Sequence, residues 1–155
     1  MISPYIGQFW GKARPSEGGP GWHPLSYHSL DVVAVGAALL DGHAPWRRWL
    51  SQSSGLPEED ASSLFLYALA LHDLGKFSYV FQAKAVEAFS SIHGRNPALA
   101  NDPGHDSVGR TIWMDCIRGS EWAFGPNGLI WLCQNKRARD CAEQWVLAAI
   151  GHHGR

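Results

Sequence analysis

The sequence predicts an all-α fold, a bundle of about five to seven helices in one domain spanning residues 1–155. Hydrophobic residues make up 45% of the 155 residues and charged residues 17%, which is the composition of a globular chain with a core. Apolar residues recur at intervals of three and four in several segments, as they do along helices. No segment alternates polar and apolar residues for long, so we expect no sheet.

The N-terminal part of the chain divides into an arm and a first helix. Residues 1–22 are rich in glycine and proline and predict an irregular arm, which Phe9 and Trp10 could pin to the body. A helix is predicted to begin at His23-Pro24, because proline suits a first helical turn, and to end near Asp41-Gly42. Its expected inward face consists of Leu25, His28, Val32, Val35 and Leu39.

The middle of the chain predicts three further helices. Residues 46–50 indicate a short amphipathic piece, and residues 51–55 indicate a loop. Proline followed by three acids at residues 57–60 is typical of a helix start, since acids stabilise the positive end of the helix dipole. This helix is expected to continue to His72-Asp73, and a further one to cover residues 77–91.

The C-terminal third predicts two helices around a turn-rich segment. One helix opens at residues 102–105, which places His105 in its first turn, and continues to Cys116. Residues 119–128 predict turns, and residues 129–133 predict an apolar segment. The last helix has a core face of Cys141, Trp145, Val146, Ala149 and Ile150 and ends at residues 151–154. A basic patch precedes it (Lys136, Arg137, Arg139), which either contacts phosphates or is a solvated helix face.

Charge and cysteine usage narrow the classes of function. A formal net charge of -1, from 13 basic and 14 acidic residues, argues against gripping duplex nucleic acid by phosphate neutralisation alone. Three cysteines without a Cys-x-x-Cys pattern indicate free thiols in a reducing compartment. No signal peptide and no span of about 18 apolar residues is visible, so we expect a cytoplasmic protein without membrane contact.

Histidines carry the chemical signal. His72 and Asp73 are adjacent, and Gly75 and Lys76 follow them, which leaves a cation close to any ligand that the pair binds. Five imidazoles and one carboxylate come from four predicted helices (His28, His72, Asp73, His105, His152 and His153). Such a donor set suits iron, manganese, nickel, cobalt or zinc, and suits magnesium or calcium poorly. Taken singly, His28 also fits a core histidine, and His105 fits a residue that hydrogen-bonds locally at a helix start.

Four segments in order resemble the HD nuclease domain of the type I CRISPR-associated nuclease-helicase. These segments are Trp22-His23-Pro24-Leu25-Ser26-Tyr27-His28-Ser29-Leu30-Asp31, Leu71-His72-Asp73-Leu74-Gly75-Lys76, Gly104-His105-Asp106-Ser107 and Gly151-His152-His153-Gly154. The early Phe9-Trp10-Gly11-Lys12-Ala13 also fits that family's start. The resemblance covers nearly the whole chain, and the ordered set is far more specific than any His-Asp pair alone.

The resemblance implies an HD-domain helical bundle with a site for two divalent transition-metal ions (iron, manganese, nickel or cobalt). It implies that His28, His72 and Asp73 hold one ion and that Asp73 bridges to a second ion held by His105, His152 and His153. Such pairs of ions clamp the attacking and leaving oxygens of a phosphodiester. Asp73 and Lys76 would be catalytic, with Lys76 holding the phosphate or offsetting developing charge.

The resemblance also implies the partners: single-stranded DNA, a helicase region or subunit, and a guide-RNA surveillance complex. The family carries a further acidic metal ligand downstream of the two adjacent histidines, and usually a helicase region beyond. We therefore expect a domain shortened after His153, without its C-terminal part or the helicase region, whose second ion is weak or absent. The ion of His28, His72 and Asp73 then lacks one carboxylate. Asp31 and Asp106 are candidates to replace it, and the sequence does not choose between them.

Two other interpretations remain open. The chain could be an HD phosphohydrolase that acts on nucleotides or cyclic nucleotides, since that superfamily uses similar His and His-Asp elements. It could also be a shortened, non-catalytic HD module that binds a CRISPR complex or a nuclease partner.

Overall fold

A computed structural model of the chain describes residues 6–13, 21–98, 101–118, 120 and 136–152. Within them lie seven α-helices and one two-stranded sheet, which confirms the all-α class and the expected number of helices. The predicted turns at 119–128, apart from residue 120, and the apolar segment 129–133 lie outside the described residues, as does His153. Among the residues described, no helix has both the length and the hydropathy that crossing a bilayer requires.

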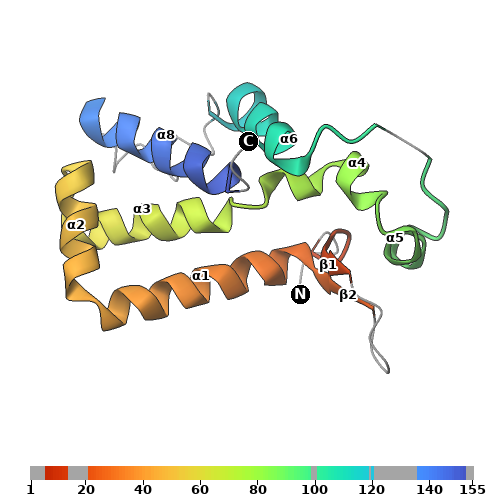
Figure 1. Cartoon of the computed structure of the whole chain (residues 1–155), viewed down its shortest axis with the longest axis horizontal. Coiled ribbons are helices and arrows are strands. Elements are labelled where there is room, and N and C mark those ends of the chain that lie inside the picture. The colour runs from red at the N-terminus through yellow and green to blue at the C-terminus, as the bar shows by residue number, and fades with distance from the viewer. Residues whose placement is uncertain (1–5, 14–20, 99–100, 119, 121–135, 153–155) are drawn as a thin grey trace.

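The elements in chain order are β1 (Trp10–Ala13), β2 (Trp22–Pro24), α1 (Leu25–Gly42), α2 (Ala44–Ser54), α3 (Glu58–Ala70), the 3₁₀ helix η1 (Leu74–Phe77), α4 (Tyr79–Gln82), α5 (Val86–His93), α6 (His105–Ile112), the π-helical turn η2 (Trp113–Ile117) and α8 (Lys136–Ile150). Helix α3 lies at the centre, with α1 on one side and α8 on the other, while α2 closes one end (Figure 1). At the opposite end of α3 the chain continues into η1 and α4, with α6 packed against η1 (Figure 1). The small sheet lies at the start of α1, near this same end (Figure 1).

The N-terminal arm is not wholly irregular. Strand β1 pairs antiparallel with β2, so the expectation of no sheet was wrong for these residues. The buried side chain of Gln82 accepts a hydrogen bond from the Trp10 backbone N–H and donates one to the Trp10 carbonyl, each at 2.9 Å. Because the partners of β1 are β2 and a glutamine 72 residues away, local sequence pattern could not reveal the strand.

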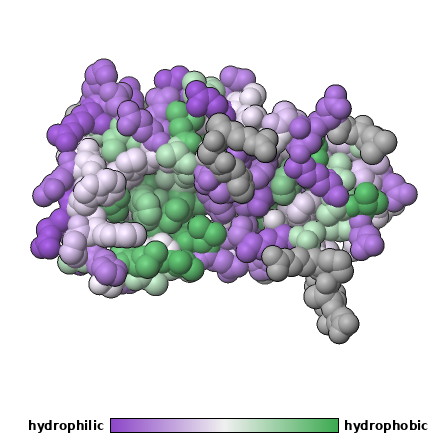
Figure 2. Space-filling model, viewed as in Figure 1, coloured by the Kyte–Doolittle hydropathy of each residue, from purple (hydrophilic) through white to green (hydrophobic). Residues whose placement is uncertain are grey.

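Helix α1 ends where expected but begins at Leu25, because His23 and Pro24 belong to β2, and its buried face also differs from the prediction. Leu25, His28, Gly36 and Leu40 are buried, whereas Val35 and Leu39, predicted to face inward, are 62% and 44% exposed. The cause is Gly36: a Cβ atom there would collide with Leu69, so α1 and α3 approach each other at this glycine. Figure 2 shows an apolar area on the face where α1 and α3 lie in Figure 1, and Val35 and Leu39 are among the exposed large hydrophobic residues of the described part of the chain.

Three predicted boundaries also differ. Residues 51–54, predicted as loop, belong to α2, where the buried Ser54 hydroxyl donates to the Leu50 carbonyl at 2.8 Å, and the turn is at Gly55, whose φ is +72°. Helix α3 ends at Ala70, before His72-Asp73. The single helix expected at 77–91 is two helices: α4 begins after Ser78, which accepts a hydrogen bond from Phe81 N–H, and ends at Gln82, and α5 begins at Val86.

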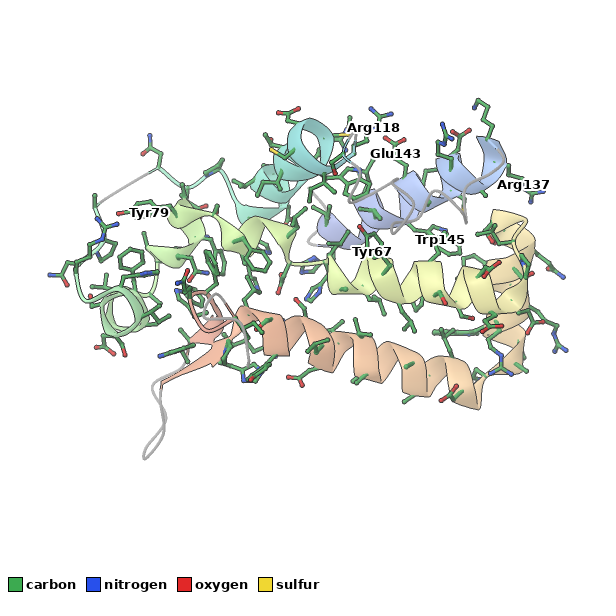
Figure 3. The ribbon with its side chains drawn as sticks, turned by 180° about the vertical axis from the view of Figure 1, so that it is seen from behind. Tyr67, Tyr79, Arg118, Arg137, Glu143 and Trp145 are labelled. Carbon is green, nitrogen blue, oxygen red and sulfur yellow. The ribbon has the colours of Figure 1, made fainter. Side chains whose placement is uncertain are left out.

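Apolar packing holds the end of α8 beside the start of η1. Trp113 of η2, Val146 and Ile150 of α8, and Leu74 of η1 are buried in one cluster. On the surface, Arg118 pairs with Glu143 of α8 at 2.8 Å, and the two side chains face each other in Figure 3. Together these contacts place His152, two residues beyond the end of α8, next to the junction between α3 and η1.

Candidate metal centre

His72 and Asp73 lie in the turn that joins α3 to η1. The turn is closed by hydrogen bonds from Leu74 N–H to the Leu71 carbonyl at 2.9 Å and from Lys76 N–H to the Asp73 carbonyl at 2.8 Å. Neighbouring side chains within a helix would point about 100° apart. Because the pair lies in a turn, the His72 ring and the Asp73 carboxylate lie side by side, with Nε2 3.1 Å from Oδ2.

Side chains from several elements surround the Asp73 carboxylate and form one cluster with it (His28, His72, Asp73, Lys76, His105 and His152). Asp73 is 1% exposed, and its Oδ2 lies 3.0 Å from His28 Nε2 on α1 and 2.7 Å from Lys76 Nζ. Its Oδ1 lies 3.6 Å from His105 Nε2, at the start of α6. The ring of His152 lies beside those of His72 and His105, with centroids 5.5 and 5.8 Å away. The fold therefore brings together five of the predicted metal ligands and Lys76.

Two of the histidines use one nitrogen for a backbone hydrogen bond. His72 Nδ1 lies 2.8 Å from the carbonyl of Leu69, and His152 Nδ1 lies 3.1 Å from that of Ala149. A carbonyl oxygen only accepts, so Nδ1 carries the proton in both rings. In the neutral ring Nε2 then has the lone pair, and backbone carbonyls commonly orient metal-ligating histidines in this way.

Glycines allow α6 to approach η1 closely enough to deliver His105. A Cβ atom on Gly75 would lie 2.6 Å from the carbonyl carbon of His105 and 2.7 Å from the backbone nitrogen of Gly109, and closer still to the His105 oxygen. A Cβ atom on Gly109 would lie 2.9 Å from the Gly75 nitrogen. On the other side, Gly11 of β1 packs against Leu25 and the Cβ of His28. Sequence reasoning gave Gly75 only the role of a helix stop.

Burial and charge set the protonation of the cluster. Burial raises the pKa of the Asp73 carboxyl, but the hydrogen bonds and charges of His72 and Lys76 outweigh it and hold that pKa well below its usual range. Burial also lowers the pKa of His28, assisted by Lys76, against the opposing effect of Asp73. At neutral pH the chain therefore presents an ionised carboxylate and a neutral imidazole, the forms that bind metal.

Two groups of side chains could each hold an ion, and they share Asp73. His28, His72 and Asp73 form the first group, and Asp73, His105 and His152 form the second, with ligand atoms within 4.8 Å of one another in each. The donor chemistry fits, because imidazole plus carboxylate suits divalent transition metals. Asp73 Oδ1 supports the fit: it is buried without a hydrogen-bond partner, a costly state that a cation would relieve.

The predicted basic patch is remote from this centre. Lys136 and Arg137 begin α8, whereas His152 follows its far end, and a 15-residue helix is about 22 Å long. Lys136 pairs with Asp140 at 2.5 Å, and Arg137 donates to the Gln52 carbonyl at 2.7 Å. These contacts fit the interpretation of a solvated helix face better than that of a phosphate site.

A family model described as "Cas3, HD domain" matches residues 10–155. The chain belongs to the Cas3 HD-domain family. Among curated relatives of this HD domain, the CRISPR-associated endonuclease/helicase Cas3 of Escherichia coli (strain K12) is 29% identical over 168 residues, covering 97% of this chain and 18% of the relative. The protein of that name from Thermus thermophilus is 45% identical over 69 residues, 44% of this chain and 8% of the relative. This Cas3 HD domain thus spans less than a fifth of either relative, and no solved structure matches it significantly.

Proposed function

We propose that this chain is a metal-dependent phosphodiesterase that cuts single-stranded DNA as the nuclease domain of type I CRISPR interference. The observation that carries the proposal is the buried Asp73 carboxylate, which is shared by two groups of histidines from separate parts of the chain. Membership of the Cas3 HD family and two relatives named as Cas3 endonuclease/helicases support the nuclease class.

The residues would divide the work between metal binding and charge stabilisation. His28, His72 and Asp73 hold one divalent ion, and Asp73, His105 and His152 hold a second, with His153 as a further ligand. Divalent ions held there would supply Lewis-acid stabilisation of the phosphodiester and lower the pKa of bound water. Lys76 is the cation nearest to the shared carboxylate, with its Nζ 2.7 Å from Asp73 Oδ2. We propose that this ammonium turns to the scissile phosphate when Asp73 binds metal, and that it then offsets developing charge.

Delivery of the DNA is proposed to depend on partners. The chain has a net charge of -1, and its basic patch lies at the end of α8 far from the centre, so it has little means of capturing a nucleic acid by charge alone. A helicase region or subunit, together with a guide-RNA surveillance complex, would present the single strand to the cluster. The names of the relatives, which pair endonuclease with helicase, support this arrangement.

The test is hydrolysis by the full chain, stripped with a chelator and reloaded with manganese, cobalt, nickel or ferrous iron under anaerobic conditions. The substrates are circular single-stranded DNA, the matching duplex, and a panel of nucleotides and cyclic nucleotides. We expect metal-dependent cutting of the circular single strand that stops when the chelator is added again. The double variant His72→Ala with Asp73→Ala should abolish both the cutting and the binding of metal.

The chain contains its own control pair. His23 and Asp31 also form a histidine–aspartate contact, at 3.0 Å, but His23 is only half-buried, Asp31 is exposed, and neither belongs to the two groups of side chains that could hold an ion. Changing both to alanine should leave cutting and metal content unaltered. Hydrolysis of nucleotides without DNA would replace the nuclease proposal by a phosphohydrolase, and metal binding without any hydrolysis would leave a binding module.

A further inference from the structure

An exposed aromatic side chain follows directly after the lysine of the cluster. Phe77 is the last residue of η1 and is 42% exposed, although phenylalanine is usually a buried residue. Its neighbour in sequence is Lys76, whose Nζ lies 2.7 Å from Asp73 Oδ2. A single exposed apolar residue is common on protein surfaces, so only its surroundings can give it a role.

The N-terminal arm holds a second aromatic ring against Phe77. The rings of Phe9 and Phe77 pack edge to face, with centroids 5.2 Å apart and planes at 66°. The Phe9 carbonyl accepts a hydrogen bond from Leu25 N–H at 2.8 Å, which fixes Phe9 to the start of α1. Gln82 also joins the arm to η1, because its side chain bonds to the backbone of β1 and to the Lys76 carbonyl. Phe77 is thus held in position by its neighbours while much of its surface remains open to solvent.

Lysines give the same area a positive charge. Lys76 lies between the cluster and the arm, since its Nζ is also 3.4 Å from the Gly11 carbonyl. The next residue of β1, Lys12, is exposed, and Gly11 itself packs against the Cβ of His28. Burial lowers the pKa of His28, and the charge of Lys12 adds to this effect, as expected for a cation close to the centre. An aromatic surface combined with cations is how proteins bind single-stranded nucleic acids, through stacking on the bases and attraction to the phosphates.

We propose that Phe77, supported by Phe9, stacks on a base of the single strand next to the scissile phosphate, and that Lys12 contacts a phosphate of the same strand. This inference rests on the proposed function for its ligand, single-stranded DNA, and deepens it by adding a subsite for a base beside the metal centre. A base has a flat face for the exposed ring, and the backbone has the negative charge that complements Lys12 and Lys76.

The subsite would also explain a preference for single strands without a preference for sequence. Every base has a face on which an aromatic ring can stack, so stacking tolerates any sequence. The bases of a duplex are already stacked and paired, and they are not available to a ring at the protein surface. Stacking would therefore supply binding that the net charge of -1 does not supply.

The test compares the binding of DNA by the full chain and by Phe77→Leu, which keeps apolar bulk against Phe9 and removes the flat ring. The probes are a fluorescent oligothymidine and an abasic strand of the same length, titrated with metal-stripped protein at low salt and followed by anisotropy. Loss of one stacked base corresponds to about 5-fold or more in affinity. Phe77→Leu should therefore weaken binding of oligothymidine by at least this factor and leave the abasic strand unchanged, and Phe77→Trp should restore the binding.

Two other variants separate stacking from charge and from general surface effects. Lys12→Gln should weaken the two strands equally and reduce the slope of log K against log salt by about 0.7, the value for one phosphate of a single strand. An unchanged slope would refute the phosphate contact. Trp46→Ala is the control, because this ring is 51% exposed but belongs to α2, which closes the other end of α3 (Figure 1). It should bind both strands as the unmodified chain does.

The inference is overturned if Phe77→Leu weakens the two strands equally or weakens neither, or if the unmodified chain binds no single strand. Those outcomes leave the proposed function to the cutting assay, which is measured separately. Base-dependent binding through Phe77 without any cutting would instead overturn the proposed function and support the subsite. Should Phe77→Leu not fold, photocrosslinking of the unmodified chain to a strand that carries iodouracil decides the question. A crosslink to Phe77 or Phe9 supports the inference, and crosslinks to other residues alone refute it.

Discussion

Replacing Gly75 by alanine should move α6 away from η1 and abolish metal binding at one of the two proposed ion positions, that of Asp73, His105 and His152. The new Cβ atom would lie 2.6 Å from the carbonyl carbon of His105, where ordinary contacts begin at 3.4 Å, so the backbones must part by at least 0.8 Å (3.4 minus 2.6). His105 Nε2 now lies 3.6 Å from Asp73 Oδ1, and the same shift would bring this separation to about 4.4 Å. Two donors bound to one ion at about 2.1 Å each can be at most about 4.2 Å apart, so they could no longer share it.

The cost in stability follows from overpacking against backbone, which cannot move aside as a side chain can. Overpacked sites lose about 1–3 kcal/mol, and we expect the upper end here, which lowers the melting temperature by about 6–12 °C in a chain of this size. The assays are thermal unfolding of the metal-free chain and elemental analysis after metal loading. We expect the ion of His28, His72 and Asp73 to be retained and the other to be lost.

Gly42→Ala is the matched control, because a Cβ atom there meets nothing within 4 Å. It should leave both the melting temperature and the metal content close to those of the unmodified chain. If Gly75→Ala behaves like this control in both assays, the argument that close backbone contact positions His105 is wrong.

Three other perturbations have definite expected outcomes. In metal-free protein, the lowered pKa of His28 means that the unfolded chain takes up a proton there before the folded chain does, so the free energy of unfolding should fall as the pH drops below 6.5. The lowered pKa of Asp73 adds a further loss of stability below pH 3.8. Urea titrations at several pH values should show that the free energy of unfolding depends less steeply on pH below 6.5 in His28→Gln than in the unmodified chain. Lys76→Met removes the ammonium that competes with metal for Asp73 Oδ2, so calorimetry should show Mn²⁺ binding at least several-fold tighter, because a buried charge pair is screened less than an exposed one. DNA cutting should fall, and weaker metal binding would contradict this argument. Gln82→Ala removes three hydrogen bonds, two buried ones to Trp10 and a partly buried one to the Lys76 carbonyl, and should cost about 3 kcal/mol in calorimetric unfolding. An effect below about 0.5 kcal/mol would show that β1 does not depend on Gln82.

Most of the helices, and the side chains proposed to form the metal centre, could be predicted from the sequence because both depend on local sequence patterns. The three-and-four spacing after Pro24 and the acids after Pro57 predicted α1 and α3, and His72-Asp73 beside Gly75-Lys76 predicted chemistry. Helical periodicity depends on neighbours along the chain, and so do caps and breakers. The ordered histidine motifs also predicted the family that the comparisons identify.

Tertiary contacts decided what the local pattern could not. Gly36 against Leu69 determined which side of α1 is buried, so that Val35 and Leu39 are exposed, and Gln82 determined that Trp10 lies in a strand. Both effects depend on residues that are distant in sequence and meet only in the folded chain.

The sequence by itself determined which donor atoms this protein owns: the imidazoles, the Asp73 carboxylate and the lysine after Gly75. Only the tertiary structure decided their grouping, with Asp73 shared by two sets of histidines and with Asp106, not Asp31, beside His105. The reason is geometric. A metal position depends on donor separations of a few ångströms between segments far apart in the chain, and the packing of backbone at Gly75 and Gly109 sets the approach of α6 to η1.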